Sequence, residues 1–379
     1  MTIRERESKK HGKVFEVYFN YKEDGVTRRY SKSGFFTKKE AKEHGILKQA
    51  ELKQNGRLKK EVNISLNEVF YDFLENDCKR YHYDTIYLFK QTHTYFKDEL
   101  GNKDIKLINF RTLQKYFNSR SDKGLATNKN IGKTLKQVFN YAIKLEYIQN
   151  NPMALVNIQG VTKETEKKNQ ILRFNELEYI TSRLNESNKF EHKAFAIAMY
   201  IAYYTGSRLS ETLALNKSDF DFQNDLIYFN KKLIYKGLKK QDYYTTDVMK
   251  SNKSKSIIPL ADPLKEVLVE WFNINPYDKV ICDELGLYIN RRHMDIIINQ
   301  ISKEINIDFN FHMLRHSFAT NLYASNVDLK MAQELMRHEN VNTTLSFYTH
   351  LEQENKKEVL KGVFNKKSDE NVSNLQYFN

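Results

Sequence analysis

Three short stretches of the sequence combine residue types that could bind an anion and act on it. In the first, TGSRLSE (residues 205–211), an apolar stretch ends at Gly206 and Arg208 follows at once. The planar guanidinium of Arg208 can bind two phosphate oxygens. Glu211 lies three residues further on, so it can share a helix face with Arg208 and hold that guanidinium. Taken alone, the pair also fits an ordinary salt bridge at the start of a helix.

The second stretch is FHMLRHSFATNLYA, residues 311–324. His312 and Arg315 lie three residues apart, so on a helix they share a face and can meet one oxyanion together. His316 follows His312 at the spacing of two metal ligands, but the motif is not HExxH, so we expect no metal. Taken alone, His312 also fits a structural histidine. Apolar residues at helical spacing predict the helix itself: Leu314, Phe318 and Leu322.

The third stretch is LMRHENVNTTLSFYTHL, residues 335–351. Asn342 or Thr343 could cap a helix that carries Leu345 and Tyr348. A tyrosine hydroxyl has a pKa of about 10, so it needs a cationic setting to attack as a nucleophile. The chain has 24 tyrosines, and nothing intrinsic to Tyr348 separates it from one that packs in a core or lies on the surface.

The charge of the chain favours a polyanionic partner. The 379 residues include 61 Lys and Arg against 48 Asp and Glu, a net charge of +13. Residues 1–60 alone carry +9 of this, which leaves +4 for the rest. A basic head on a nearly balanced body predicts a DNA-binding head. A solubilising surface is the alternative.

Composition excludes several other classes. The length predicts two or three domains, and 40% hydrophobic residues are enough to build their cores. Cys78 and Cys282 lie far apart without a CxxC motif, which argues against a disulfide framework or a cysteine zinc site. The charged start shows no signal peptide, and the longest apolar run, 194–204, is too short to span a bilayer. We therefore expect a cytoplasmic protein without membrane contact.

The head must present its cations on regular elements. Alternating residues predict strands within 13–36, joined by a turn at EDG. Thr37 with Glu40 forms a capping box that predicts a helix to about Lys53. A basic strand face can enter a DNA groove. Five cations are expected on the sheet and the helix start: Arg28, Arg29, Lys32, Lys38 and Lys39.

The remaining elements divide into a helical part and a mixed part. Helices are predicted from Ser65 and over about 84–98, 110–121 and 127–147, and the polar stretch 162–169 is interpreted as a linker. A helix opens the mixed part, and 193–204 forms a buried one. LIYFNKKLIY, DYYTTDVM and SIIPL predict one small antiparallel sheet, followed by helices to about Leu360.

The order of the chemical groups, an Arg with a Glu, then His-x-x-Arg, His and Tyr, resembles the tyrosine recombinase (phage integrase) family. The resemblance covers most of the chain. The ending NTTLSFYTHL and the basic head are most similar to integrases of Gram-positive phages, pathogenicity islands and conjugative transposons. The resemblance implies a multidomain, mainly α fold with small β-sheets. The implied parts are an arm-type DNA-binding domain (1–60), a helical core-binding, SAM-like domain (63–160), a linker (161–169), a mixed α+β catalytic domain (170–365) and a tail (366–379).

The resemblance also implies a role for each group. Tyr348 is implied as the nucleophile, and His338 stands in the place usually written Leu-Gly-His, where Met336–Arg337 replace small residues. The family's lysine, a proton donor on a β-hairpin before Ile-Pro-Leu, matches Lys250, with Lys253 and Lys255 as competitors. Ser251 occupies the position where the family usually has threonine, and Ser256 occupies a position where the family often has arginine. The other implied catalytic residues are Arg208, its supporting Glu211, His312 and Arg315.

The implied activity is site-specific cleavage and rejoining of double-stranded DNA through a 3′-phosphotyrosine, to integrate and excise a mobile element. Arginines would neutralise the phosphate, so no metal, ATP or other cofactor is expected. A homo-tetramer on core and arm sites, an excisionase and a host DNA-bending protein are implied partners. The alternatives are a type IB topoisomerase, a chromosome-dimer resolvase and a catalytically dead DNA-binding regulator.

Overall fold

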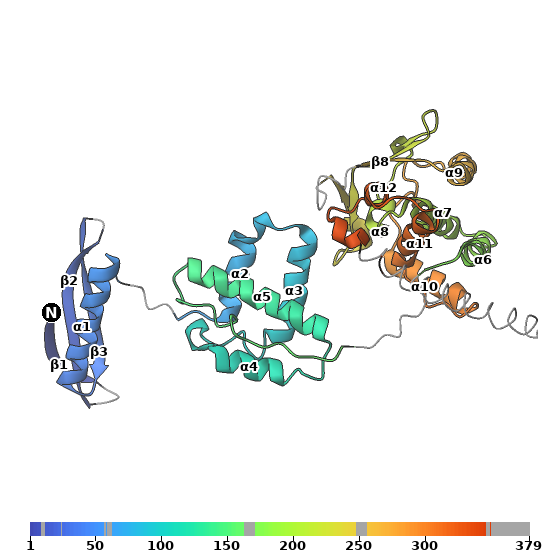
Figure 1. Ribbon diagram of the computed structural model, residues 1–379. Coiled ribbons are helices and arrows are strands. Elements are labelled where there is room, and N and C mark those ends of the chain that lie inside the picture. The colour runs from blue at the N-terminus through green and yellow to red at the C-terminus, as the bar shows by residue number, and fades with distance from the viewer. Residues whose placement is uncertain are drawn as a thin grey trace, which may run out of the picture. The chain divides into compact units, whose positions relative to one another are not determined.

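The computed structural model describes residues 1–8, 12–23, 25–56, 58, 63–162, 171–247, 256–345 and 349 (Figure 1). They form two compact units: Met1–Arg80 with Leu88–Thr162, and Tyr81–Tyr87 with Lys163–Asn379. The fold is mostly helical with small antiparallel sheets, which confirms the predicted class. The division into three domains remains a prediction. Within the described ranges, no helix is both long and apolar enough to cross a membrane.

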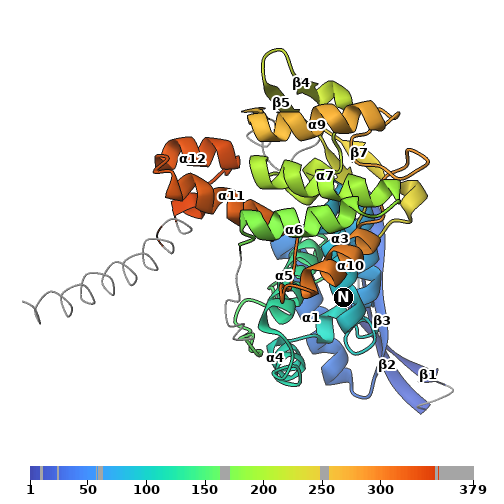
Figure 2. The same ribbon diagram turned by 90° about the vertical axis from the view of Figure 1, so that its right-hand side faces the viewer.

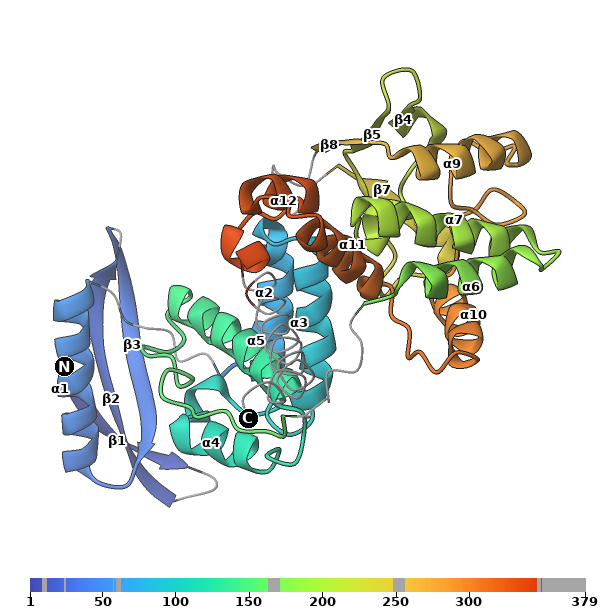
Figure 3. The ribbon, with the colours of Figure 1, turned by 45° about the vertical axis from the view of Figure 1, so that its right-hand side comes forward.

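The N-terminal head is a three-stranded antiparallel sheet in the order β1-β2-β3, with α1 on one face (Figure 3). The predicted capping box is confirmed, because Glu40 N donates to Thr37 Oγ1 and Thr37 N to Glu40 Oε2. Strand β1 was not predicted, since TIRERES carries one apolar residue and gives no hydrophobic alternation. The elements are β1 (Thr2–Ser8), β2 (Gly12–Glu23), β3 (Val26–Phe35) and α1 (Lys38–Asn55).

The helices predicted from Ser65 onward are confirmed. Ser65 and Glu68 form a capping box at the first of them. Their core is unusually aromatic, because Phe70, Phe73, Phe96, Phe117 and Phe139 are all fully buried. Burying aromatic area of this size contributes the main stabilisation of such a helical domain. The helices are α2 (Leu66–Asn76), α3 (Tyr83–Phe96), α4 (Phe110–Asn118) and α5 (Leu125–Lys144).

The mixed part is built around one buried helix, α7 (Phe190–Thr205), which confirms the prediction for 193–204. Helices α6 (Phe174–Asn185) and α9 (Asp262–Ile274) pack on it from two sides (Figure 2), and α11 (His312–Ala324) packs on it as well. A helix covered on several sides must be apolar around its whole circumference, as α7 is from Ala194 onward. The remaining helices of this part are the short α8 (Leu209–Thr212), α10 (Arg291–Lys303) and α12 (Leu329–Met336).

The prediction of one sheet in this part is wrong, because its strands form two. One sheet has the order β4-β5-β8 and the other pairs β6 with β7. The chain turns inside LIYFNKKLIY, so its two halves pair with different partners, which local alternation cannot reveal. The strands are β4 (Phe220–Asp221), β5 (Leu226–Phe229), β6 (Lys232–Ile234), β7 (Tyr244–Thr246) and β8 (Ser256–Pro259).

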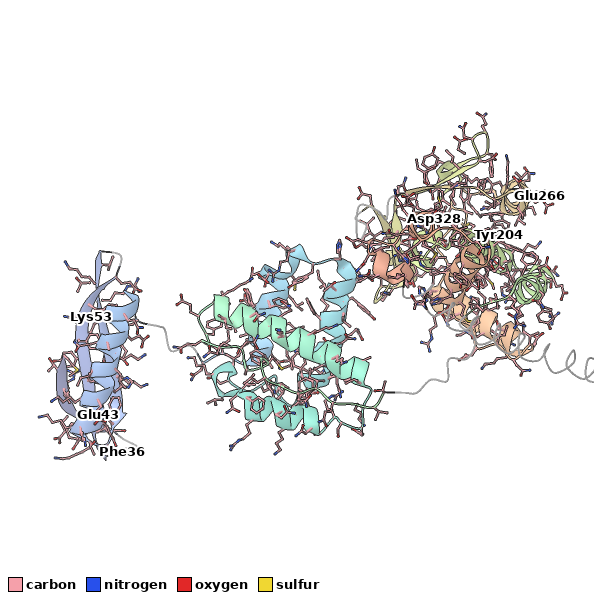
Figure 4. All side chains as sticks on the ribbon, viewed as in Figure 1. Phe36, Glu43, Lys53, Tyr204, Glu266 and Asp328 are labelled. Carbon is pink, nitrogen blue, oxygen red and sulfur yellow. The ribbon has the colours of Figure 1, made fainter. Side chains whose placement is uncertain are left out.

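The last two helical segments that the structure describes each begin after a side-chain cap. Asp328, labelled in Figure 4, caps α12 by accepting from the backbone N–H groups of Lys330 and Met331. The next helical residues, 341–345, begin after Asn340, whose side chain accepts from Asn342 N at 2.9 Å. The predicted cap at Asn342 or Thr343 is therefore wrong by two or three residues, because the shorter loop already ends at Asn340.

Candidate active site

The first arginine stands on a sharp turn that leaves the buried helix. Helix α7 ends at Thr205, and Gly206 takes a left-handed conformation with φ 61°. Arg208 then caps α8, with its backbone N 3.0 Å from Glu211 Oε2 and its Nη1 2.7 Å from Oε1. The predicted contact between the two side chains is confirmed. Glu211 is buried, whereas the side chain of Arg208 is 40% exposed and remains accessible.

The second arginine, Arg315, is buried and connects three segments of the chain by hydrogen bonds. Arg315, on α11, is 3% exposed, and its guanidinium donates to the carbonyls of Gly206 and Met336. Phe318 of the same helix packs against the Gly206 turn, where an added Cβ would lie 2.5 Å from its ring. Only glycine fits this position, since it meets both the positive φ and the close approach. Arg315 thus fixes the Arg208 turn to the end of α12.

A third arginine, Arg337, was not predicted as a functional residue. Its side chain is fully buried, and Nη2 lies 3.2 Å from Glu211 Oε2. One buried carboxylate therefore serves two arginines. The sequence offered one signal, because Arg337 stands where the family has small residues before the histidine. It occupies a left-handed turn there with φ 54°.

The two predicted histidines join the same cluster. His312 is the first residue of α11, and its backbone N donates to Asn310 Oδ1 at 3.1 Å. His338 follows the α12 turn, and its Nδ1 lies 2.8 Å from Thr344 Oγ1. Burial lowers the pKa of each histidine to about 4, and the neighbouring Arg315 and other cations add to the effect. Both rings are therefore neutral near pH 7, each able to donate one N–H and accept one proton.

The charged groups keep their charges at neutral pH. Burial lowers the pKa of Arg315 to about 9, and that of Arg337 to about 10 in spite of its pairing with Glu211. Burial alone would raise the pKa of Glu211, but Arg337 and Arg208 outweigh it and hold the pKa below its usual value. These four groups, Arg208, Arg315, Arg337 and Glu211, thus sum to +2, a charge suited to a phosphate that gains negative charge in a transition state.

A pocket of about 250 Å³ opens beside this cluster. Arg208 and His312 line it, and so do Lys236 and Arg291, which sequence reasoning missed. Neither of the latter two lies in a recognisable motif, so only the fold brings them to the site. The remaining lining residues are Ser207, Leu209, Ser210, Tyr235, Asn310 and Phe311.

Two predicted catalytic residues, Lys250 and Tyr348, lie outside the described residues, as do Lys253 and Lys255. Their placement in the cluster stays a prediction. In sequence, the described residues next to Lys250 are Asp247 and Ser256, where β8 begins, and those next to Tyr348 are Leu345 and Thr349.

The structure distributes the predicted cations of the head over both faces of its sheet. Arg29 lies on the open face, where its guanidinium stacks 4.2 Å from the Tyr18 ring centre. Strand alternation places Arg28 and Lys32 on the face that α1 covers, and Lys38 and Lys39 are the first two residues of that helix. Glu43 and Lys53, further along α1, are exposed and are labelled in Figure 4.

The open face also carries two cations that the prediction omitted. Arg4 and Arg6 both pair with Glu16, whose side chain is only 4% exposed, and Ser31 donates to the same carboxylate. Arg4 and Arg29 also flank Tyr18. The open face of the sheet therefore carries Arg4, Arg6 and Arg29, and the DNA contacts of Arg28, Arg29, Lys32, Lys38 and Lys39 stay a prediction.

Only one group of side chains in the described ranges has the arrangement of a metal site: Glu191, His192 and His293, whose ligand atoms lie within 4.8 Å of one another. His293 Nδ1 lies 3.0 Å from Glu191 Oε1, so these two side chains contact each other directly. His312 and His316, the pair with metal-ligand spacing, meet edge to face with ring centres 4.7 Å apart.

Comparison with known proteins finds similarity to one family. Residues 170–355 match the phage integrase family. A "Tyrosine recombinase XerC-like" protein of Caldanaerobacter subterraneus subsp. tengcongensis is 28% identical over 67% of this chain and 70% of its own length. The "Prophage ps2 probable integrase" of Lactococcus lactis subsp. lactis is 25% identical over 93% of this chain and 97% of its own.

The fold has solved counterparts. The Tn1549 transposon integrase, in complex with a circular intermediate DNA, superposes with a TM-score of 0.63 at 18% identity. The match covers 75% of this chain and 95% of that one. At this identity the match establishes the shared fold.

Proposed function

Because residues 170–355 place the chain in the phage integrase family of tyrosine recombinases, we propose that it cuts and rejoins double-stranded DNA through a covalent bond between Tyr348 and a 3′ phosphate. The purpose of the reaction is to integrate and excise a mobile genetic element. The observation that carries the proposal is the convergence of Arg208, Arg315, His312 and His338 around the Gly206 turn. These residues come from three separate segments, so their meeting is a property of the fold.

The geometry supports a division of labour among these groups. Arg208 is the most accessible of the three arginines, so it contacts a non-bridging oxygen of the scissile phosphate first. Arg315 lies beneath it and stabilises the charge that develops when the tyrosine oxygen attacks. His338 is neutral and has Nδ1 engaged by Thr344, which leaves Nε2 for the phosphate or for a proton.

The bonds formed and broken balance without external energy. The Tyr348 oxygen attacks phosphorus and its proton passes to a neutral base, for which we propose Nε2 of His338, while the 5′ oxygen leaves with a proton from a lysine, for which we propose Lys250. A free 5′ hydroxyl from another strand then attacks the phosphotyrosine and releases the tyrosine. The roles of Tyr348 and Lys250 rest on the family resemblance and on the order of the motifs.

We also propose that the chain works as a tetramer on two DNA sites in the bacterial cytoplasm, since the reaction joins four strand ends. The head would bind separate arm sites through its open face, with Arg4, Arg6 and Arg29 in contact with DNA. An excisionase and a host DNA-bending protein would set the direction of the reaction.

Covalent capture tests the proposal and identifies the target sequence in the same experiment. The full chain is incubated with DNA that spans both flanks of its gene, denatured with detergent, and the DNA that stays attached to protein is sequenced. We expect one short sequence to be enriched, with the break at a single phosphate. Tyr348→Phe should retain DNA binding and lose the adduct. Adducts of equal yield from that variant would refute the assignment of the nucleophile.

The same assay separates recombination from topoisomerase activity. A recombinase should form adducts only on duplexes that contain the captured sequence. Relaxation of supercoiled plasmids that lack this sequence would instead favour a type IB topoisomerase.

A further inference from the structure

Arg337 combines two features that are unfavourable for an arginine. Its side chain has no exposed surface. Its backbone adopts the left-handed conformation, φ 54° and ψ 43°, at the end of α12, a position that favours glycine. A buried charge and a left-handed backbone conformation each cost free energy, so a favourable contact must offset this cost.

The compensating contact is the carboxylate that also holds Arg208. Glu211 Oε2 accepts from Arg337 Nη2 at 3.2 Å, although the two residues lie 126 positions apart. The guanidinium carbon also sits 4.1 Å from the centre of the Phe229 ring. Nε and Nη1 are buried, and no acceptor for them lies in the part of the chain that the structure describes. Its main electrostatic partner is therefore Glu211.

We propose that Arg337 is a positioning residue for DNA cleavage, acting through Glu211 on Arg208 and through its own backbone on His338. This inference rests on the proposed function and deepens it. The side chain links the floor of the site to the turn that carries His338. The same turn is held from the other side, since Arg315 donates to the carbonyl of Met336.

The net charge of the cluster explains why the loss of Arg337 should lower the cleavage rate and leave DNA binding nearly unchanged. With Arg337 present, Arg208, Arg315, Arg337 and Glu211 sum to +2. Without it they sum to +1, which still matches the single negative charge of a phosphodiester in the ground state. The transition state carries more negative charge, so the loss falls mainly there. Glu211 would also attract Arg208 more strongly, away from the phosphate.

The test is single-turnover cleavage of a nicked duplex that carries the captured sequence, with the DNA concentration varied. Arg337→Met should lower the rate at saturating DNA about 10- to 100-fold, below the loss from direct removal of an oxyanion donor. The half-saturating DNA concentration should change less than about threefold. Arg337→Lys should recover most of the rate, because only one N–H of the guanidinium contacts Glu211 and an ammonium can replace it.

Two further variants separate positioning from simple stabilisation. Lys240→Met removes another ion pair with a buried carboxylate, Asp283, from a cation that is 33% exposed and lies outside the cluster, and should leave cleavage unchanged. Glu211→Gln combined with Arg337→Met should be no slower than Glu211→Gln alone, since the Arg337 side chain acts on Arg208 through Glu211. The unfolding midpoint is recorded for every variant.

The outcomes are distinct. Arg337→Met cleavage within threefold of the unaltered chain would overturn the inference, and so would a defect confined to the half-saturating concentration. If the methionine variant does not fold, Arg337→Gln replaces it, because glutamine keeps an N–H toward Glu211 without the charge. A glutamine variant as active as the lysine variant would then overturn the charge argument. If the unaltered chain forms no adduct, the proposed function itself fails.

Discussion

Replacement of Gly206 by alanine should weaken both the fold and the chemistry of the catalytic part. Gly206 has a φ of 61° and a carbonyl that accepts from Arg315. A left-handed conformation costs an L-residue about 1–2 kcal/mol. The new Cβ would lie 2.5 Å from Cδ1 of Phe318, and an ordinary contact begins at 3.4 Å, so the ring or the turn must move by about 1 Å. Overpacking of this kind costs about 1–3 kcal/mol more.

The movement matters because Phe318 and Arg315 share α11. A displacement of about 1 Å in groups that align a reaction can reduce the rate about 100-fold. We therefore expect Gly206→Ala to lose about 2–5 kcal/mol of stability and, in addition, about 100-fold in single-turnover cleavage.

Gly286→Ala is the matched control. Gly286 has a φ of 72°, and its added Cβ would lie 2.6 Å from Cδ1 of Tyr277, so both costs recur at a turn outside the active-site cluster. Urea unfolding and cleavage of the nicked duplex, measured on both variants, separate stability from alignment. Similar unfolding free energies with a slow Gly206 variant are expected. Equal cleavage rates for the two variants would refute the idea that the Gly206 carbonyl aligns Arg315.

Three further results are expected. Burial lowers the pKa of His338 from 6.5 to about 4, so the folded state resists protonation that the unfolded chain accepts. Stability should fall as pH drops from 6.5 toward 4, by at most about 2 kcal/mol at pH 5 from this group, because solvent screens the partly buried ring. His338→Asn should flatten the dependence in urea titrations, and an unchanged slope would contradict the pKa shift. Thr344→Val should slow cleavage several-fold, because it removes the hydroxyl that contacts His338 Nδ1, and should lower the free energy of unfolding by about 1 kcal/mol. Thr344→Ser keeps the hydroxyl and should cleave at nearly the rate of the unaltered chain. A valine variant that cleaves at the unaltered rate would show that the contact is dispensable. Glu16→Gln should destabilise the head by about 1–3 kcal/mol, since Arg4 and Arg6 lose their shared carboxylate; unchanged hydrogen exchange in β1–β3 would contradict this.

Local signals in the sequence were sufficient for the helices. The capping boxes at Thr37 and Ser65 involve residues three positions apart, so a short window contains the whole interaction. The contact between Arg208 and Glu211 was predictable for the same reason. Strand pairing is different, because it depends on segments distant in sequence. The two halves of LIYFNKKLIY therefore could not be assigned to separate sheets from their pattern alone.

The same distinction explains which parts of the site escaped prediction. Arg337 shows the ordinary pattern of an exposed cation after a helix, and its partner lies 126 residues away. Lys236 and Arg291 reach the pocket only through the fold. In the head, Glu16 is an acidic residue in an alternating strand, yet it is buried because three side chains of the neighbouring strands converge on it.

The three arginines differ in exposure, and this difference orders their roles. The side chain of Arg208 is 40% exposed, so it can exchange bound water for phosphate oxygens and later release the phosphate of the product. Arg315 and Arg337 are buried and bonded to the protein, the first to two backbone carbonyls and the second to Glu211. Buried charges are screened little by salt and are not solvated by water, so the potential they impose on the site is fixed before DNA arrives. A phosphate that reaches Arg208 therefore meets a field that needs no rearrangement of the two deeper cations, and pre-organised charge of this kind favours the transition state over the bound ground state.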